Sequence, residues 1–196
     1  MALRTEVSIS LPPCGSAFVL FYKNGVPEDI KQRIKSNTAI SGNSQPVEIA
    51  KWDILFRESG LNATSDKLFD WTHATDDKIK YFSGHAEYTA QFKYSDNVKG
   101  RTWLSLGVVN NLAHVWVNGK DCGIAWTAPY QVEVTDALKK GVNDIKIVVV
   151  NTWANALRGA DNGKAPYEGI WTNAKYRMKG DALLPAGLMG PVEIKN

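Results

Sequence analysis

Residues 86–94 alternate strictly between two kinds of side chain. In an extended chain one side would carry Ala86, Tyr88, Ala90, Phe92 and Tyr94, and the other Glu87, Thr89, Gln91 and Lys93. Because successive side chains of a β-strand point to opposite faces, this pattern predicts a strand with one buried and one solvated face. Such strands are typical of antiparallel sheets, since parallel sheets are covered on both faces.

Two further segments and one turn also indicate β-structure. Residues 130–134 alternate in the same way, and residues 145–150 are apolar on both faces, so we expect the latter strand to be central or covered on both sides. The dipeptide Asn118-Gly119 follows the apolar run 113–117. It suits a two-residue hairpin turn, in which both central residues need positive φ. Many short strands joined by such turns favour an all-β antiparallel sandwich.

The composition suits one domain of this kind. The chain has 196 residues, of which 44% are hydrophobic and 22% charged, which is enough for a real core. The net charge of +3 is too small to draw the protein strongly toward nucleic acid or anionic lipid. No apolar run reaches the roughly 20 residues of a membrane-spanning helix. We therefore expect neither nucleic-acid binding nor a membrane span.

The N-terminal part of the chain differs from the rest. Residues 17–22 form a continuous apolar run, which we expect to pair with residues 7–11 in a β-hairpin, whereas residues 24–46 are polar and rich in Gly, Asn and Ser. We therefore predict that residues 1–46 are a hairpin and linker at the end of a preceding module, and that residues 47–196 form the sandwich. The first residues lack the apolar segment of a signal peptide, so the chain is either cytoplasmic or a piece of something larger.

Known catalytic and metal-binding motifs are absent from the sequence. There is no nucleophile elbow, phosphate-binding loop or zinc-protease motif, and His73, His85 and His114 have no metal-ligand spacing. Cys14 and Cys122 could form at most one disulfide, and whether they pair stays open. We expect no cofactor, with a structural calcium held by loop carboxylates as the open alternative.

Two carboxylates of the chain could form a catalytic pair, because glycosidases use two carboxyl groups across the scissile bond. Asp161 and Glu168 lie in the segment 155–186, whose Gly and Pro residues break any periodicity. We expect this segment to be a long loop that is functional or contacts a partner. Spacing alone does not place the two carboxyl groups on facing walls of a cleft, and most loop carboxylates are solvated. A small hydrolase is therefore an alternative and not the leading interpretation.

The tryptophan residues are more informative about a possible binding site than the carboxylates are. Of the 7 Trp residues, Trp126, Trp153 and Trp171 stand beside turn residues. An indole face can stack on a sugar ring while neighbouring polar groups bind the hydroxyls. Such polar groups follow in the run 151–158. The competing interpretation is that these Trp residues pack against the sandwich ends or a neighbouring domain, as large aromatic residues usually do.

An ordered set of segments carries a family resemblance. They are YFSGHAEY at 81–88, VWVNGK at 115–120, WTAPY at 126–130, VEVT at 132–135, NTWAN at 151–155 and LLPAGLMGPV at 183–192, preceded by GSAFVLF at 15–21 and WDILF at 52–56. Together they resemble the C-terminal galactose-binding-like (sugar-binding jelly-roll) module of glycoside hydrolases, closest to the α-L-rhamnosidase family 106 proteins and their relatives. The family usually has a basic residue at the position of Ala156, whereas here Arg158 lies two positions further on.

The resemblance implies a galactose-binding-like β-sandwich of about eight strands. It also implies a parent enzyme that degrades polysaccharide in the periplasm or outside the cell. The catalytic carboxylates of that family belong to a barrel of roughly 250 residues, for which this chain has no room.

Our leading hypothesis is therefore a non-catalytic accessory domain that binds carbohydrate weakly or packs on a glycosidase catalytic domain. A purely structural module without glycan binding is the alternative, with the small hydrolase as a third. The candidate carbohydrate-binding or interdomain residues are Trp126, Tyr130, Asn151, Trp153, Asn155, Arg158 and Trp171.

Overall fold

Strand β4 (His85–Tyr94) lies inside a six-stranded antiparallel sheet and buries the apolar side that its alternation predicts. The computed structural model describes residues 6–7, 9, 16–28, 30–31, 44–96, 98, 100–174 and 182–195. In the order in which they pair, the strands of this sheet are β3 (Leu61–Ser65), β2 (Trp52–Phe56), β4, β10 (Gly141–Val150), β7 (Leu112–Val117) and β8 (Lys120–Ala125).

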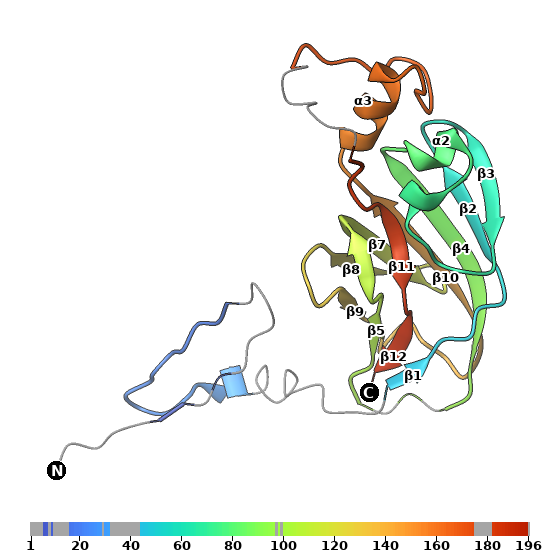
Figure 1. Cartoon of the computed structure of the whole chain (residues 1–196). Helices are drawn as coiled ribbons and strands as arrows, with labels where there is room; N and C mark the ends of the chain where they lie inside the picture. Colours follow the sequence, from blue (N-terminus) through green and yellow to red (C-terminus); the bar gives the residue numbers. More distant parts are fainter. Residues whose placement is uncertain are drawn as a thin grey trace.

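A second layer faces this sheet (Figure 1). This layer contains two sheets. The strands of the four-stranded sheet are, in pairing order, β1 (Ser44–Pro46), β12 (Glu193–Lys195), β5 (Trp103–Ser105) and β9 (Gln131–Glu133). The two-stranded sheet pairs β11 (Gly187–Gly190) with β6 (Val108–Asn110). The paired strands of all three sheets run antiparallel. The protein is thus the antiparallel β-sandwich that the sequence predicts.

The central strand β10 is covered as expected. It pairs with β4 on one side and β7 on the other. Ile147 and Val149 are fully buried between the layers, and Val148 on the opposite face is also buried. The predicted hairpin turn after β7 is confirmed as well, because Asn118 and Gly119 have φ values of 51° and 78°.

Apolar side chains from both layers form one core between the sheets. An aromatic cluster lies at the end of this core that is nearest to the short helices. Phe56, Trp71 and Phe82 meet edge to face there, with ring centroids 4.7–5.6 Å apart. Edge-to-face contact adds to the energy of burial. Three packed aromatic rings therefore close this end of the core.

The segment 155–186, predicted to be irregular, begins with a helix. Helix α3 (Ala154–Asp161) buries Asn155, Ala156 and Gly159 on one face. Gly159 allows this close packing, because a Cβ there would lie 2.7 Å from the Lys164 carbonyl oxygen and 2.8 Å from the Cβ of Tyr81. The sequence analysis missed this helix because glycine usually signals a helix end, whereas here tertiary packing favours it inside the helix.

The described part of the N-terminal region is extended and exposed. Residues 16–22 carry no assigned strand, and Phe18 is 95% exposed. Figure 1 shows this segment apart from the sandwich. Most of the strand with which we expected it to pair lies outside the described residues, as does Cys14, so the hairpin and the boundary at residue 46 stay predictions. The four-stranded sheet already includes Ser44–Pro46.

Candidate functional site

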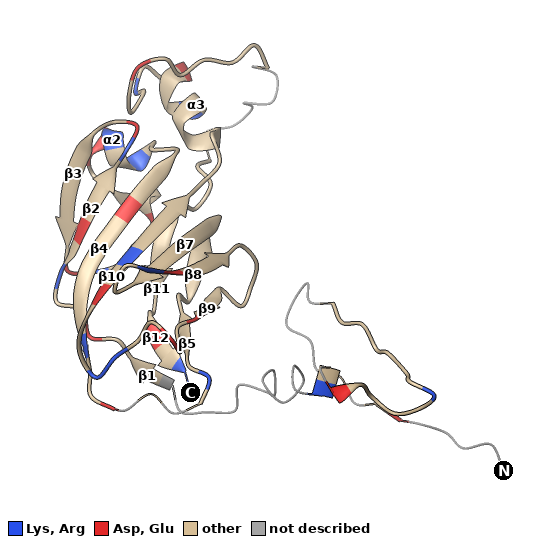
Figure 2. Ribbon diagram, turned by 180° about the vertical axis from the view of Figure 1, so that it is seen from behind, with Lys and Arg blue, Asp and Glu red and all other residues tan. Residues whose placement is uncertain are grey.

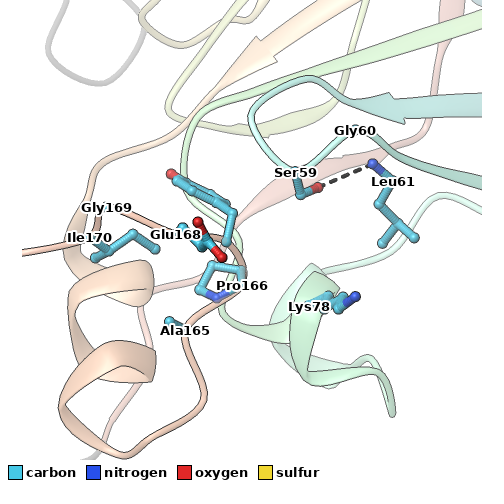
Figure 3. A pocket seen from close by; sticks show the side chains of 10 residues that line it. Ser59, Gly60, Leu61, Lys78, Ala165, Pro166, Glu168, Gly169 and Ile170 are labelled. Atoms are coloured by element: carbon cyan, nitrogen blue, oxygen red, sulfur yellow. Dashed lines mark hydrogen bonds between the residues drawn. The ribbon is translucent and has the colours of Figure 1, made fainter.

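The end of the sandwich that carries α3 contains an open cavity of about 780 Å³. It lies between the β2–β3 turn, helix α2 (Asp77–Lys80) and the loop that follows α3 (Figure 3). Its lining residues are Ser59, Gly60, Leu61, Lys78, Ala165, Pro166, Tyr167, Glu168, Gly169 and Ile170. The lining thus combines apolar surface with one cationic and one anionic side chain, a mixture that suits a polar ligand with apolar faces.

Two exposed tryptophans are connected to the cavity lining, one by a ring contact and one by its place in the sequence. Trp153, at the N-terminus of α3, is 57% exposed, and its ring centroid lies 6.4 Å from that of Tyr167, which lines the cavity. Trp171 is 77% exposed and directly follows Ile170, another lining residue. Trp153 thus contacts a residue of the cavity lining, and Trp171 is the neighbour in sequence of another. Both indoles present apolar area to solvent, as a stacking contact requires.

Tyr167 anchors the cavity loop to the sandwich. Its hydroxyl donates a hydrogen bond of 2.5 Å to the carbonyl oxygen of Ser83, and its ring meets Phe82 edge to face at 5.9 Å. Burial, together with the nearby negative charge of Glu58, raises the pKa of Tyr167 to about 12. The phenol is therefore neutral and a hydrogen-bond donor at physiological pH.

A carboxylate–imidazole pair lies beside this loop. Nδ1 of His85 lies 2.6 Å from Oε1 of Glu58, and the backbone N–H of His85 donates to Oε2 at 2.8 Å. Gly84 makes this arrangement possible, because a Cβ on it would lie 2.3 Å from the Glu58 carboxylate. The sequence analysis did not single out Glu58, because only the folding of β2 against β4 brings the two segments together.

The two predicted asparagines have structural roles in this region. Asn151 accepts a hydrogen bond from the backbone N–H of Gly84 and donates to the carbonyl oxygen of Phe82, each at 2.9 Å. Asn155 donates to the carbonyl oxygen of Leu184 at 2.7 Å and accepts from the backbone N–H of Leu184 at 2.9 Å. Both amides are thus occupied by backbone groups. They hold the loops around the site in place.

Arg158 lies on α3 with a partly shielded side chain. Its Nε and Nη1 atoms are shielded from solvent and have no hydrogen-bond partner among the described residues.

Trp126 and Tyr130 lie elsewhere, in the connection between β8 and β9, which Figures 1 and 2 both place away from α3. Trp126 is 72% exposed, whereas Tyr130 packs against the core.

Within the described residues, the charge distribution and the arrangement of possible metal ligands restrict which ligands the protein could bind. Figure 2 shows basic and acidic residues both spread along the ribbon of the sandwich. No group of three or more His, Cys, Asp or Glu side chains within the described ranges is arranged to hold a metal ion. Cys122 is partly buried, and burial raises the pKa of its thiol. No helix in the part of the chain that the structure describes is long and apolar enough to cross a membrane.

The fold is an antiparallel β-sandwich with a loop-built cavity at one end. Residues 66–181 match the family described as glycosyl hydrolase 2 galactose-binding domain-like, and the chain belongs to this family. The match covers β4 and β10, the part of the cavity lining formed by Lys78 and residues 165–170, and all seven candidate residues.

Two much longer proteins resemble most of the chain. The putative beta-glucuronidase of Formosa agariphila is 32% identical over 187 residues, covering 80% of this chain and 16% of that protein. The solved structure of a rhamnosidase from Novosphingobium sp. PP1Y matches with a TM-score of 0.67 and 33% identity, covering 81% of this chain and 16% of that one. The chain thus spans about a sixth of the length of either relative.

Proposed function

We propose that this chain is a non-catalytic accessory domain of a polysaccharide-degrading glycoside hydrolase, and that the α3 end binds carbohydrate weakly. The observation that carries the proposal is the exposed indole of Trp153, whose ring contacts Tyr167 in the lining of the 780 Å³ cavity; the exposed Trp171 directly follows the lining residue Ile170. A single stacked sugar and a few hydroxyl contacts correspond to dissociation constants from about millimolar to about micromolar. The parent enzyme would act on glycans such as those containing rhamnose or glucuronic acid, as the names of the two relatives suggest.

The three exposed tryptophans allow a controlled test. The chain is titrated with L-rhamnose, galactose, glucuronic acid and pectic oligosaccharides while tryptophan fluorescence is followed. We expect a saturable change that Trp153→Ala or Trp171→Ala weakens at least tenfold. Trp126→Ala removes an equally exposed indole far from the cavity and should leave the affinity unchanged. Circular dichroism confirms that each variant is folded, and a flat response of the folded wild-type chain to every sugar would refute glycan binding.

A second candidate function is purely structural, and residues 17–22 favour it. Phe18, Leu20 and Phe21 are 95%, 70% and 72% exposed. Contiguous apolar surface of this kind usually marks a contact with another protein surface. In this alternative the chain docks on a neighbouring module of its parent, and residues 1–46 complete that module.

The structural alternative has its own test. The isolated chain should self-associate through the uncovered segment in analytical ultracentrifugation, and the double variant Phe18→Ser, Leu20→Ser should be monomeric. Val142→Ser changes a comparably exposed side chain of the sandwich and serves as the control. A wild-type chain that stays monomeric at high concentration would count against this alternative.

We also propose that the parent acts in the periplasm or outside the cell, as the resemblance to polysaccharide-degrading enzymes implies. Fractionation of cells that express the whole gene, followed by immunodetection of this domain, tests the location. Detection in the cytoplasm alone would refute it.

A further inference from the structure

The outer face of the six-stranded sheet has an open hollow of about 360 Å³, which shares no lining residue with the cavity at the α3 end. It lies over β3, β2 and β4, which run side by side in Figure 2. Ile54 and Tyr88 are buried in the core on the other side of these strands. Because side chains alternate along a strand, the residues beside them point outward. Six outward residues line the hollow, namely Asp53, Leu55, Asn62, Thr64, Glu87 and Thr89.

The pairing of the three strands arranges these six side chains in two rows. The first row is Asn62, Leu55 and Glu87, and the second is Thr64, Asp53 and Thr89. Neighbouring strands are about 4.8 Å apart and every second residue lies about 6.6 Å further along, so the array measures roughly 10 Å by 7 Å. One apolar side chain thus stands among five hydrogen-bonding side chains, on an area the size of a single hexose.

The polar groups of the hollow are held in place and can still bind a ligand. Arg57 donates to the carboxylate of Glu87, and Nζ of Lys51 lies 3.4 Å from Oδ1 of Asp53. A carboxylate has about four lone-pair sites, so each of these two can accept further hydrogen bonds. The side chain of Asn62 is exposed on the edge strand β3. The hollow therefore combines oriented acceptors with an exposed amide.

We propose that this hollow is a second carbohydrate site, which binds a neutral sugar residue of the glycan. The inference rests on the proposed function for its ligand class alone, since it uses no residue of the α3 end. Leu55 provides an apolar floor for the C–H face of the sugar ring, and the surrounding polar groups match its hydroxyls. The lining contains two carboxylates and no basic side chain. Like-charge repulsion therefore disfavours an acidic sugar.

Two other kinds of occupant fit this lining less well. A calcium ion needs six to eight oxygen ligands, whereas the hollow has two carboxylates, each beside a cationic side chain. A protein partner would cover these charged groups, although charged residues are depleted at the centres of protein interfaces. A sugar can bind to the same carboxylates through its hydroxyls while leaving them partly solvated.

The hollow adjoins the cavity along the β2–β3 hairpin. Leu61 lines the cavity, and the next residue, Asn62, lines the hollow. A glycan chain that is bound at the α3 end thus has a second contact close by. Two weak contacts with one chain raise the overall affinity, because the second contact forms at a high effective concentration. We therefore expect neutral tetrasaccharides to bind more tightly than the corresponding disaccharides.

Solution NMR of the full chain tests the site residue by residue. Neutral disaccharides of glucose, galactose and rhamnose are titrated, with digalacturonate as the acidic probe. The signals followed are the side-chain amide of Asn62 and the backbone amides of Thr64 and Thr89. We expect at least one neutral disaccharide to shift these three signals saturably. Digalacturonate should bind to the hollow at least tenfold more weakly.

A pair of matched variants tests the lining. Asp53→Ala removes the central acceptor of the second row and should weaken neutral-sugar binding about tenfold or more, because a hydrogen bond to a charged group is lost. Asp144→Ala removes an exposed carboxylate from β10, where it accepts a hydrogen bond from Gln91 outside the hollow. This control should leave the affinity unchanged. Circular dichroism confirms that both variants are folded.

The location of the shifts separates this proposal from the proposed function. Shifts confined to the indole N–H signals of Trp153 and Trp171 would overturn the second site, while carbohydrate binding at the α3 end stands. Shifts confined to the three signals of the hollow would support the second site and refute binding at the α3 end. A chain that responds to no probe at any of these signals would refute both.

Two further outcomes would overturn the proposed ligand. Equally tight binding of digalacturonate, or equal weakening by Asp53→Ala and Asp144→Ala, would show that the carboxylates of the hollow do not select a neutral sugar. Broadening of the three signals with increasing protein concentration, without a response to sugar, would assign this face to a protein partner.

Discussion

The indole nitrogen of Trp71 donates a hydrogen bond of 2.7 Å to the hydroxyl of Tyr88 inside the core. Both residues are almost fully buried, and the same hydroxyl accepts a longer bond of 3.4 Å from the backbone N–H of Leu188. Burial raises the pKa of Tyr88 well above the ordinary tyrosine value. The phenol therefore joins the short 3-10 helix η1 (Trp71–His73) to β4 and β11, one strand from each layer.

Tyr88→Phe removes this shared acceptor and keeps the ring. Because the indole N–H of Trp71 would stay buried without a partner, we expect the free energy of unfolding to fall by about 1–3 kcal/mol. Urea denaturation followed by circular dichroism measures the change. Tyr130→Phe, at a partly buried ring on the core margin, should change stability by less than about 0.5 kcal/mol. Equal effects of the two substitutions would contradict this account of the hydroxyl.

Gly84→Ala should lower the free energy of unfolding more than a Gly→Ala substitution does at an ordinary position of positive φ. Gly84 has φ 133°, and a Cβ there would collide with the Glu58 carboxylate, so the variant must break the contact between Glu58 and His85. Gly141→Ala is the matched control, because Gly141 has φ 99° and nothing within 4 Å of the added Cβ. We expect the control to lose about 1–2 kcal/mol from backbone strain.

The Gly84→Ala variant should lose about 1–3 kcal/mol more than that control, from the displaced hydrogen bonds to charged groups. Urea titration of both variants side by side provides the comparison. The double variant Gly84→Ala, Glu58→Ala should recover part of the difference, since the carboxylate is no longer in the way. No recovery would mean that strain at residue 84, and not Glu58, dominates.

Asn155→Asp should loosen the segment that returns from the α3 end to β11. The substitution places a carboxylate oxygen where the amide now donates to the carbonyl oxygen of Leu184. Two acceptors then face each other, and we expect a loss of about 1–3 kcal/mol. Asn62→Asp on the exposed face of β3 is the control. Hydrogen exchange should be faster at the Leu184 amide in the first variant only.

Tyr167 should make the stability fall at alkaline pH. Its folded pKa of about 12 lies above the ordinary value of 10.0, so the fold favours the neutral phenol. This contribution is fully present below about pH 10 and is lost as the pH rises toward about 12. In urea titrations over that interval, Tyr167→Phe should lose less stability than the wild-type chain. Identical slopes for the two proteins would show that the phenol ionises normally.

Much of the sandwich could be predicted from local pattern. The alternation over residues 86–94, the doubly apolar run at 145–150 and the Asn118-Gly119 turn each became the expected element. These features depend on the period of the side chains along one strand and on the φ angles of two residues, which are local properties. The family, too, could be recognised from ordered segments.

The candidate site was only partly predictable. Trp153 and Trp171 were named from the sequence; in the structure Trp153 contacts the cavity-lining Tyr167, and Trp171 directly follows the lining residue Ile170. Lys78 and Tyr167, which line it, were not named, because neither stands in a motif and each comes from a different segment of the chain. Asn151 and Asn155 were named as ligand groups, but their amides bind backbone groups.

By itself, the sequence determined that this protein is an antiparallel β-sandwich, because strand periodicity and turn chemistry act over a few neighbouring residues. Only the tertiary structure decided which polar side chains are free for a ligand. Packing brings Glu58 to His85 and Asn155 to Leu184, and it leaves the Arg158 guanidinium shielded on α3. Whether a hydrogen-bonding group is already engaged depends on partners distant in the chain, and no local pattern encodes them.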